Sequence, residues 1–273
     1  MLTNVAQRWF KGRAFYRPAR EPFNPRLFEV APIAEDRIAK AFVQTHHYSG
    51  SYPAARERFG LYQAGALVGV AVFSVGGGPH VMRILPCEPA ASVELGRFVL
   101  LDRVGANAET WFFARCRELL ARDGYAGIVS FSDPVARTDA RGRQVFPGHI
   151  GTIYQASNAL YTGRGRARTK HLLPDGTVFD ERAKTKIRAQ AKGWRYAVDQ
   201  LVAAGAPAPM DMSLAGLRSW IDLALSQATR PLRHTGNHRY LWGLDRATTR
   251  ALPHHLAQIK ITILPYPKMD ICT

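Results

Sequence analysis

One stretch of the sequence, residues 93 to 134, constrains the fold more than any other. An apolar strand pattern, VELGRFVLLD, is followed by the helical pattern NAETWFFARCRELLARDG and then by a second apolar strand, YAGIVSFSDP. Asn107 stands where a helix N-cap is expected, Glu109 falls in the first turn, and Gly124 marks the end of the helix. This order predicts a β-α-β crossover in the middle of the chain.

The remaining patterns place further strands and helices around that crossover. An apolar period predicts a helix in IAEDRIAKAFVQTHHY, and RFGLYQAGALVGVAVFSVGGG predicts a hairpin that turns at Ala64 and Gly65. A short helix is expected over GTIYQASNALYTG, ending at Gly163. The patterns that follow predict a hairpin, a basic helix from Asp180 to about Lys192, two more helices and a strand: TKHLLPDGTVF, DERAKTKIRAQAK, WRYAVDQLVAAG, LAGLRSWIDLALSQA and HRYLWGLD. The chain is therefore expected to be an α+β sheet protein.

The charge balance points to a polyanionic partner. The chain carries 37 Lys and Arg against 21 Asp and Glu, a formal net charge of +16 at pH 7. This excess by itself does not choose between DNA, RNA and lipid headgroups. Three scattered cysteines without a Cys-x-x-Cys pair argue against a disulfide framework and a thiolate zinc site. No apolar run is long enough for a membrane span, so a soluble, cytoplasmic protein is expected.

Two segments concentrate the positive charge. Residues 1 to 28 hold six Lys or Arg against one acid, mixed with aromatic residues and prolines, which predicts an extended basic arm. Residues 164 to 195 hold ten Lys or Arg against three acids. A solvated helix face normally intersperses acids among its bases, so contact with a phosphate backbone is the better explanation. The residues expected to make these contacts are Arg164, Arg166, Arg168, Lys170, Lys184, Lys186, Arg188 and Lys192.

Within the crossover, two charged residues interrupt an otherwise apolar strand. Glu94 and Arg97 are three positions apart, so a regular strand would point them to opposite faces, and a bulge at Gly96 would change that. An arginine inside a strand is costly unless it is paired or faces a ligand, which leaves a structural ion pair or a site as explanations.

Other candidate site residues lie in the loops next to the strands. RVGANA brings small residues to a helix N-terminus, where an anion could approach the backbone, although many such turns are small for conformational reasons alone. Asp133 stands at the carboxyl end of a strand, where ligands gather in sheet proteins, or serves only as a turn residue before Pro134. Tyr154 and Tyr161 are seven residues apart and would share one helix face, and HHYSGSYP clusters His46, His47, Tyr48 and Ser49.

Taken together, HYS, ELGRFVL, NAETWF, SFSDP, GTIYQASN, YTG and GNHRYLW resemble the phage Mom family of DNA-modification proteins over roughly residues 40 to 245. The resemblance implies a fold similar to GCN5-related N-acyltransferases, with a central mixed, mostly antiparallel sheet flanked by helices and a basic helical insertion. It also implies that the protein adds a carbamoylmethyl group to adenine N6 in DNA, which shields phage DNA from restriction enzymes. The partner would be double-stranded DNA with its adenine flipped into the cleft.

The resemblance also assigns roles to individual residues. Tyr48, Arg97, Asp133 and Tyr154 would line the reaction cleft, and Tyr154 stands where relatives of this fold place a tyrosine that protonates a leaving thiolate. The residues that would stand near the cleft are His47, Ser49, Glu94, Asn107, His149 and Tyr161. Family members have been linked to iron, for which Tyr48 and Asp133 are the expected oxygen ligands.

An acyl-CoA-like donor would be held by the loop that precedes the helix of the crossover. In the fold's usual loop pattern, Arg103, Ala106 and Ala108 take the motif positions, with Asn107 beside them, so the middle glycine is missing. This departure argues against ordinary acetyl-CoA. The product also needs a new N–CH2 bond, which simple acyl transfer does not make in one step.

This interpretation divides the chain into four parts: a basic arm over 1–28, an acyltransferase-like core over 29–179, a basic helical insertion over 180–230, and a final core strand with a tail over 231–273. Two alternatives remain open. A conventional N-acetyltransferase would bind acetyl-CoA near Asn107 and act on a protein or a small amine. A non-catalytic DNA-binding protein would keep all of its activity after Asp133→Ala or Tyr48→Phe.

Overall fold

The computed structural model describes residues 5–10, 13–18, 22–77 and 79–268 of the 273-residue chain. Its contacts divide the chain into two compact units. Unit 1 consists of Met1–Pro134, His149–Gly165 and Asn237–Thr273, and unit 2 consists of Val135–Gly148 and Arg166–Gly236. The sequence expectation put residues 135–148, 166–179 and 231–236 with the core, whereas the contacts group them with the helical insertion.

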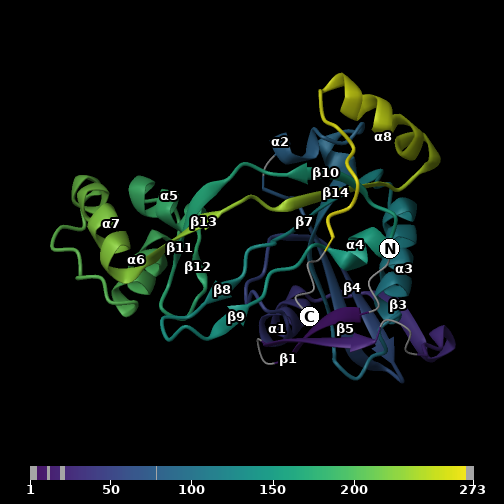
Figure 1. Ribbon diagram of the computed structural model, residues 1–273, viewed down its shortest axis with the longest axis horizontal. Helices are drawn as coiled ribbons and strands as arrows, with labels where there is room; N and C mark the ends of the chain where they lie inside the picture. Colours follow the sequence, from purple (N-terminus) through teal and green to yellow (C-terminus); the bar gives the residue numbers. More distant parts are fainter. Residues whose placement is uncertain (1–4, 11–12, 19–21, 78, 269–273) are drawn as a thin grey trace. The chain divides into compact units, whose positions relative to one another are not determined.

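Unit 1 is built on a seven-stranded sheet with the order β10-β14-β7-β6-β5-β4-β3 (Figure 1). The strands are β3 (Phe28–Pro32), β4 (Ala55–Gln63), β5 (Ala66–Ser74), β6 (Ser92–Leu100), β7 (Gly127–Ser132), β10 (Leu160–Arg164) and β14 (His238–Gly243). Only β6 and β7 pair in parallel, because the helix of the crossover joins them. The predicted α+β fold with a mixed, mostly antiparallel sheet is confirmed.

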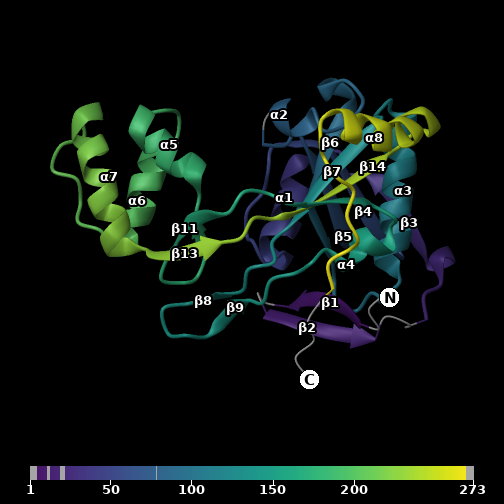
Figure 2. The ribbon, with the colours of Figure 1, turned by 45° about the horizontal axis from the view of Figure 1, so that its top comes forward.

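Helices cover both faces of this sheet. One face packs on α3 (Ala108–Arg122) and on the short α4 (Thr152–Ala156), and the other face packs on α1 (Asp36–His46), α2 (Pro79–Met82) and α8 (Arg246–Gln258). Figure 2 shows α1 and α3 on opposite sides of the strands. The strand β5, ALVGVAVFS, is apolar throughout because it is buried on both faces: Val70 and Val72 face α1, while Ala71 and Phe73 face α3.

Unit 2 has a hydrophobic core of its own. Its sheet has the order β12-β11-β13, with β11 (Arg168–Leu172), β12 (Val178–Phe179) and β13 (Arg230–His234), and it packs on α5 (Glu181–Ala189), α6 (Trp194–Ala203) and α7 (Leu214–Ala228). Asp180 caps α5 by accepting from the Arg182 N–H, and Ser213 caps α7 in the same way from Gly216. A second hairpin joins β8 (Arg137–Thr138) to β9 (Gln144–Phe146).

The N-terminal arm contains a separate antiparallel pair, β1 (Val5–Phe10) and β2 (Arg13–Pro18), so it is a hairpin rather than a simple extended arm. Five of its six basic side chains lie in residues 1–21, whose side chains are outside the described part of the structure. Two single-turn helices, η1 (Pro25–Leu27) and η2 (Pro89–Ala91), precede β3 and β6.

The helix predicted over GTIYQASNALYTG is shorter than expected, and the shared face of Tyr154 and Tyr161 is wrong. The helix expected to run to Gly163 ends at Ala156, and Asn158, with φ of 57°, turns the chain into strand β10. Tyr154 and Tyr161 therefore do not share a helix face. Asn107 does occupy the N-cap position of α3, but its backbone is helical and its side chain makes no capping hydrogen bond.

Candidate active site

Strand β6 contains the bulge that the spacing of Glu94 and Arg97 raised as a possibility. In the pairing with β5, Arg97 lies opposite Val72 and Glu94 lies opposite Ser74, and Gly96 is left without a partner. Since Val72 and Ser74 are two residues apart, Glu94 and Arg97 share the sheet face that α1 covers.

The guanidinium of Arg97 is fixed by the loop that follows α1. Its Nε donates to the Ser51 carbonyl at 2.8 Å, its Nη2 donates to the Ser51 hydroxyl at 2.6 Å, and its Nη1 donates to the Gly96 carbonyl. A side chain at Gly96 would press on this loop, because its Cβ would lie 3.1 Å from Pro53 Cγ. Burial lowers the pKa of Arg97, while Tyr48, Glu94 and Tyr154 raise it, so these three groups lie near the cation.

Tyr154 reaches the same place from the other face of the sheet. Strands β6 and β7 pair only as far as Leu95 and Ser130, and the sheet opens beyond that point. Tyr154 packs on Tyr240 and Trp242, with ring centroids 5.2 and 5.6 Å away. Burial raises the pKa of Tyr154, opposed by a hydrogen bond with Ser130 and by Arg97. The phenol therefore stays protonated at neutral pH and can donate a proton.

The loop after α1 adds a neutral histidine. His47 Nδ1 lies 3.2 Å from the backbone N–H of Ser49 and 2.9 Å from the Ser49 hydroxyl. Because a backbone N–H can only donate, Nδ1 is the acceptor and the ring proton is on Nε2. Burial, Arg97 and His149 hold the pKa of His47 well below 6.5, which keeps the ring uncharged at pH 7.

Tyr48 connects this loop to the end of β7. Its hydroxyl lies 3.3 Å from Nε2 of His149, and the backbone N–H of His149 donates to the carbonyl of Asp133 at 2.8 Å. The structure thus gathers most of the predicted cleft residues. We call the Arg97 cluster the group His47, Tyr48, Ser49, Ser51, Glu94, Arg97, Ser130, His149 and Tyr154.

Sequence patterns pointed to seven of these nine residues and missed Ser51 and Ser130. Ser51 belongs to the same polar loop, HHYSGSYP, as His47 and Tyr48. Ser130 is a polar residue inside the buried strand β7, where it also donates to the Leu95 carbonyl at 3.0 Å. The position of this serine within an apolar strand was the feature of the sequence that could have marked Ser130 as a site residue.

Tyr48 and Asp133 were also the expected iron ligands. Across residues 5–10, 13–18, 22–77 and 79–268, no three His, Cys, Asp or Glu side chains gather as a protein metal centre requires. This donor set does not by itself complete the coordination of iron, and no chemical step is assigned to a metal.

The predicted donor loop starts α3 but is a poor cradle for a diphosphate. Ala106 and Ala108 are buried, whereas Arg103 and Asn107 are exposed. The Ala108 N–H donates to the Gly105 carbonyl at 3.1 Å, and a Cβ on Gly105 would lie 3.1 Å from the Pro22 carbonyl oxygen. The carbonyl oxygens of Gly105 and Pro22, together with the Glu109 carboxylate in the first turn, place negative charge at the helix N-terminus. This negative charge disfavours binding of an anion there.

A second buried polar group forms where β14 pairs with β7 and β10. The Tyr161 hydroxyl lies 2.7 Å from Nδ1 of His238, and Arg164 hydrogen-bonds to the same phenol. His238 lies opposite Ser132 across the strand pair, and both side chains are fully buried. Burial, followed by Arg164, lowers the pKa of His238 to about 4. Tyr161 therefore belongs to this group rather than to the Arg97 cluster, and no role was predicted for His238.

The residues expected to contact phosphates fall on several elements. Arg164 ends β10 in unit 1, while the others are in unit 2, just before β11, on β11, on α5 and in the turn after it. Arg166, Arg168, Lys186, Arg188 and Lys192 are exposed, and Lys170 and Lys184 are half-buried. Arg188 forms an ion pair with Asp222 at 2.8 Å, so its charge is already balanced.

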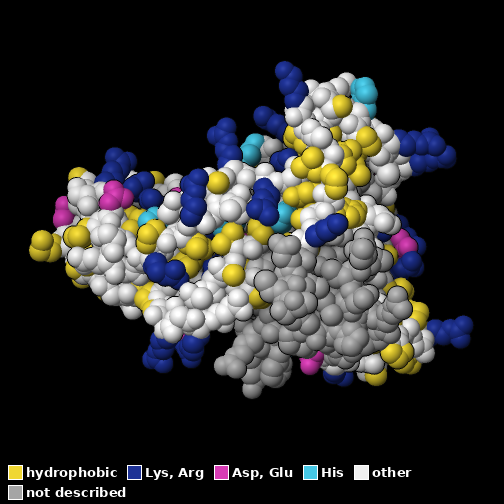
Figure 3. All heavy atoms as spheres, viewed as in Figure 1, with side chains coloured by type: hydrophobic (Ala, Val, Ile, Leu, Met, Phe, Trp, Pro, Cys, Tyr) yellow, Lys and Arg dark blue, Asp and Glu magenta, His cyan; other side chains and the backbone are white. Residues whose placement is uncertain are grey.

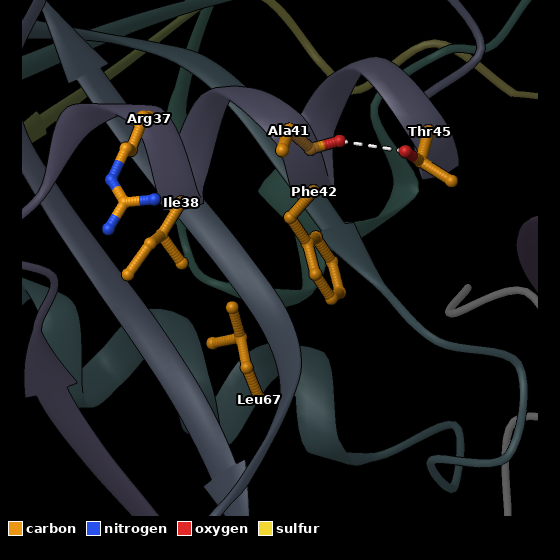
Figure 4. A pocket seen from close by; sticks show the side chains of 6 residues that line it. All are labelled: Arg37, Ile38, Ala41, Phe42, Thr45 and Leu67. Atoms are coloured by element: carbon orange, nitrogen blue, oxygen red, sulfur yellow. Dashed lines mark hydrogen bonds between the residues drawn. The ribbon is translucent and has the colours of Figure 1, made fainter.

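A shallow pocket lies elsewhere on unit 1, between α1 and β5 (Figure 4). Phe42, Ile38 and Leu67 line it, with Arg37 at one end, and Thr45 turns back to donate to the Ala41 carbonyl at 2.8 Å. None of the predicted site residues lines this pocket. No helix in the described part of the chain is long and apolar enough to cross a membrane.

Three comparisons place the chain among known proteins. The model of the Mom protein family matches residues 27–268. A search of curated proteins found no match. Among solved structures, one similar chain is titled "Tandem GNAT protein from the clavulanic acid biosynthesis pathway (without AcCoA)"; it is 11% identical, the match covers 80% of this chain and 99% of that one, and the TM-score is 0.38. A likeness at that level supports no argument about function.

Proposed function

The chain belongs to the Mom protein family of phage DNA-modification proteins, and we propose that it is a transferase that carbamoylmethylates adenine N6 in DNA. One observation carries the proposal: the bulge at Gly96 and the opening between β6 and β7 bring Arg97, Glu94, Tyr48 and Tyr154 to one place. The family's motifs predict that Arg97, Tyr48 and Tyr154 line the cleft and that Glu94 stands near it.

The proposed reaction requires two proton transfers at these residues. Adenine N6 must lose a proton as the new N–C bond forms, because its lone pair is delocalised into the ring and the amine is a weak nucleophile. The departing group must also gain a proton. Tyr154 is suited to the second task, since its phenol is buried and protonated beside a fixed guanidinium. Arg97, held by Ser51, would stabilise negative charge that develops next to it.

His47 serves as a neutral hydrogen-bond donor in this scheme. Its Nδ1 is occupied by Ser49, so its Nε2–H can donate to a substrate atom but cannot take up a proton from adenine. The carboxylate of Glu94, next to Arg97, is the stronger candidate for accepting the N6 proton. Asp133 and His149 are proposed to shape the cleft at the end of β7.

The bound partner would be double-stranded DNA with the target adenine flipped out of the stack. The basic residues from Arg164 to Lys192 would contact phosphates and hold the duplex during the reaction. An acyl-CoA-like donor and iron remain predictions, and no step is assigned to either. We also expect the protein to act in the host cell cytoplasm, where its DNA substrate is found.

Asp133→Ala separates this function from its rivals. DNA from cells that express the wild type should contain modified adenine, whereas DNA from cells with Asp133→Ala should contain none. Purified Asp133→Ala should still bind duplex DNA with an affinity within about threefold of the wild type, because phosphate contacts supply most of that affinity. Acetyl-CoA binding without any DNA modification would instead favour an ordinary N-acetyltransferase, and DNA binding with unmodified DNA in both strains would favour a non-catalytic protein.

A further inference from the structure

We propose that unit 2 holds DNA mainly with a basic face made of Arg141, Arg168 and Arg230, rather than with helix α5. This inference rests on the proposed function for its partner, duplex DNA. Two of the three residues, Arg141 and Arg230, lie outside the set that the sequence pattern indicated.

The helices of unit 2 pack on one face of its sheet, and the opposite face carries exposed arginines beside two buried side chains, Leu172 and His234. His171 lies opposite Phe179 in the sheet, and its Nδ1 contacts the Thr229 hydroxyl at 3.0 Å, at the end of α7. Phe179 belongs to the core that includes α5, α6 and α7. Because side chains alternate along a strand, Arg168 and Lys170 project from the opposite face.

Strand β13 extends this opposite face. It pairs antiparallel with β11, with Arg168 opposite His234, Lys170 opposite Leu232 and Leu172 opposite Arg230. Arg168, Lys170 and Arg230 therefore share one face of the sheet. Arg230 pairs with Leu172, so it lies four residues along the sheet from Arg168. At roughly 3.3 Å per residue this is about 13 Å, close to the length of about four base steps of DNA at 3.4 Å each.

The β8–β9 hairpin lies beside the Arg230 end of this face. Arg230 donates to both the carbonyl and the hydroxyl of Thr138 at 3.1 Å, and the backbone N–H of Ala140 donates to the Pro174 carbonyl at 2.7 Å. These hydrogen bonds hold the hairpin against the sheet. The side chain of Arg230 is exposed, and its donors contact only neutral groups, so its charge is not cancelled.

Asp139 shapes the tip of the hairpin. Its carboxylate accepts from the backbone N–H groups of Arg141 and Arg143 at 2.9 Å and pairs with the Arg143 guanidinium at 2.7 Å. The pair balances the charge of Arg143 and fixes the turn. The side chain of Arg141 is exposed at the tip, and the neighbouring Gly142 has a φ of 76° and open space where a Cβ would lie. Asp175, in the turn between β11 and β12, accepts hydrogen bonds from the backbone N–H and the hydroxyl of Thr177.

Helix α5 carries several basic side chains, but nearby carboxylates balance more of their charge than on the basic face. Asp180 and Glu181 begin the helix, and Asp222 of α7 pairs with Arg188. In Figure 3, acidic side chains lie over α5 and α7, while the side chains at the β8–β9 hairpin include Lys or Arg and no visible acid. Strand β8 begins four residues after Asp133 and β9 ends three residues before His149, so short segments of chain link the hairpin to two residues of the proposed cleft.

The test is the salt dependence of binding to an unmodified duplex, measured by fluorescence anisotropy with the full chain. Each phosphate contact contributes about 0.9 to the slope of log Kobs against log salt, so Arg141→Ala, Arg168→Ala and Arg230→Ala together should lower the slope by about 2.7. A matched triple on and after α5, Arg182→Ala, Lys186→Ala and Lys192→Ala, removes the same charge and should lower it by less than about 1.

The inference is overturned if the α5 triple lowers the slope as much as the basic-face triple does, or if the basic-face triple leaves it unchanged. Arg230→Lys, which keeps the charge, controls for misfolding and should retain most of the slope. Nucleoside analysis of the same strains keeps the two claims apart. Salt-dependent binding through the basic face with no modified adenine would refute the proposed function and leave this inference standing.

Discussion

The Arg97 cluster and the basic face of unit 2 hold their cations in opposite ways. Arg97 is half-buried, hydrogen-bonded to two carbonyls and a hydroxyl, and lies near Glu94, Tyr48 and Tyr154. Arg141 and Arg168 are exposed. A cation that several hydrogen bonds hold in one geometry can stabilise charge at one atom, whereas exposed cations attract a polyanion over a surface. The two regions therefore suit chemistry and DNA holding, respectively, and the following predictions test that division from the largest expected effect to the smallest.

Arg97→Ala should have the largest effect. It removes the donors to Ser51 and Gly96 and leaves Glu94 without its neighbouring cation, which should cost about 2–3 kcal/mol of unfolding free energy and lower modification by at least about 100-fold. Urea denaturation and nucleoside analysis measure the two effects. Arg97→Lys keeps the charge without the fork of donors and should recover stability better than activity.

Arg168→Ala is the counterpart on the basic face. It should change the unfolding free energy by less than about 0.5 kcal/mol, because its side chain is exposed. If Arg168→Ala destabilises the protein as much as Arg97→Ala does, the contrast between the two regions is lost.

His238 should make the stability of unit 1 depend on pH. An unfolded histidine takes up a proton near pH 6.5, whereas burial and Arg164 lower the pKa of folded His238 to about 4. The unfolded chain therefore binds more protons between these values. The stabilisation that neutral His238 contributes to the free energy of unfolding is fully present above pH 6.5. It is lost as the pH falls toward 4, by roughly 3 kcal/mol in total.

Urea unfolding at several pH values measures this loss. His238→Gln should make the decline between pH 6.5 and 4 shallower than in the wild type. The exposed His254 on α8 supplies a matched control, since His254→Gln should leave the decline unchanged. An equally steep decline in His238→Gln would refute the assignment.

Tyr154→Phe tests the proton donor while keeping the ring that packs on Tyr240 and Trp242. Modification should fall by about 100-fold, with a stability change of about 1 kcal/mol from the lost hydrogen bond with Ser130. DNA binding should not change. Full modification by Tyr154→Phe would mean that another group protonates the departing group.

The smallest effect is expected at the exposed ion pair between Arg188 and Asp222. Asp222→Ala should alter the unfolding free energy by no more than about 1 kcal/mol. It should also free Arg188 and raise the affinity for DNA slightly, which anisotropy at low salt would detect. A large loss of stability would show that this pair does more than balance charge.

The sequence predicted the crossover, the first hairpin and the three helices of unit 2 because their signals are local. It could not decide whether Glu94 and Arg97 share a face, since the bulge at Gly96 depends on pairing with β5. The strand nature of Tyr161 was missed for a similar reason: its partner Tyr240 lies far along the chain. Helix α8 was hidden by Pro253, although Asp245 caps it by accepting from the Thr248 N–H.

For the candidate site too, the residues within one local segment or motif were predicted, and those that depend on distant contacts were missed. His47, Tyr48 and Ser49 form one local loop, and Arg97, Asp133 and Tyr154 followed from the motifs of the family. Ser51 could be identified only once the hydrogen bonds of Arg97 were known. The turn at Asp139 was missed because its importance depends on the charge of Arg143 and on the neighbouring sheet.

Nucleoside mass spectrometry tests the central claim most directly. DNA from cells that express the wild type is digested to nucleosides and compared with DNA from cells that express Arg97→Lys or Tyr154→Phe. The account predicts a deoxyadenosine that is heavier by one carbamoylmethyl group in place of a hydrogen, abundant with the wild type and strongly reduced with both variants. Unmodified deoxyadenosine with a folded, DNA-binding wild type would contradict it, as would equal modification by all three proteins.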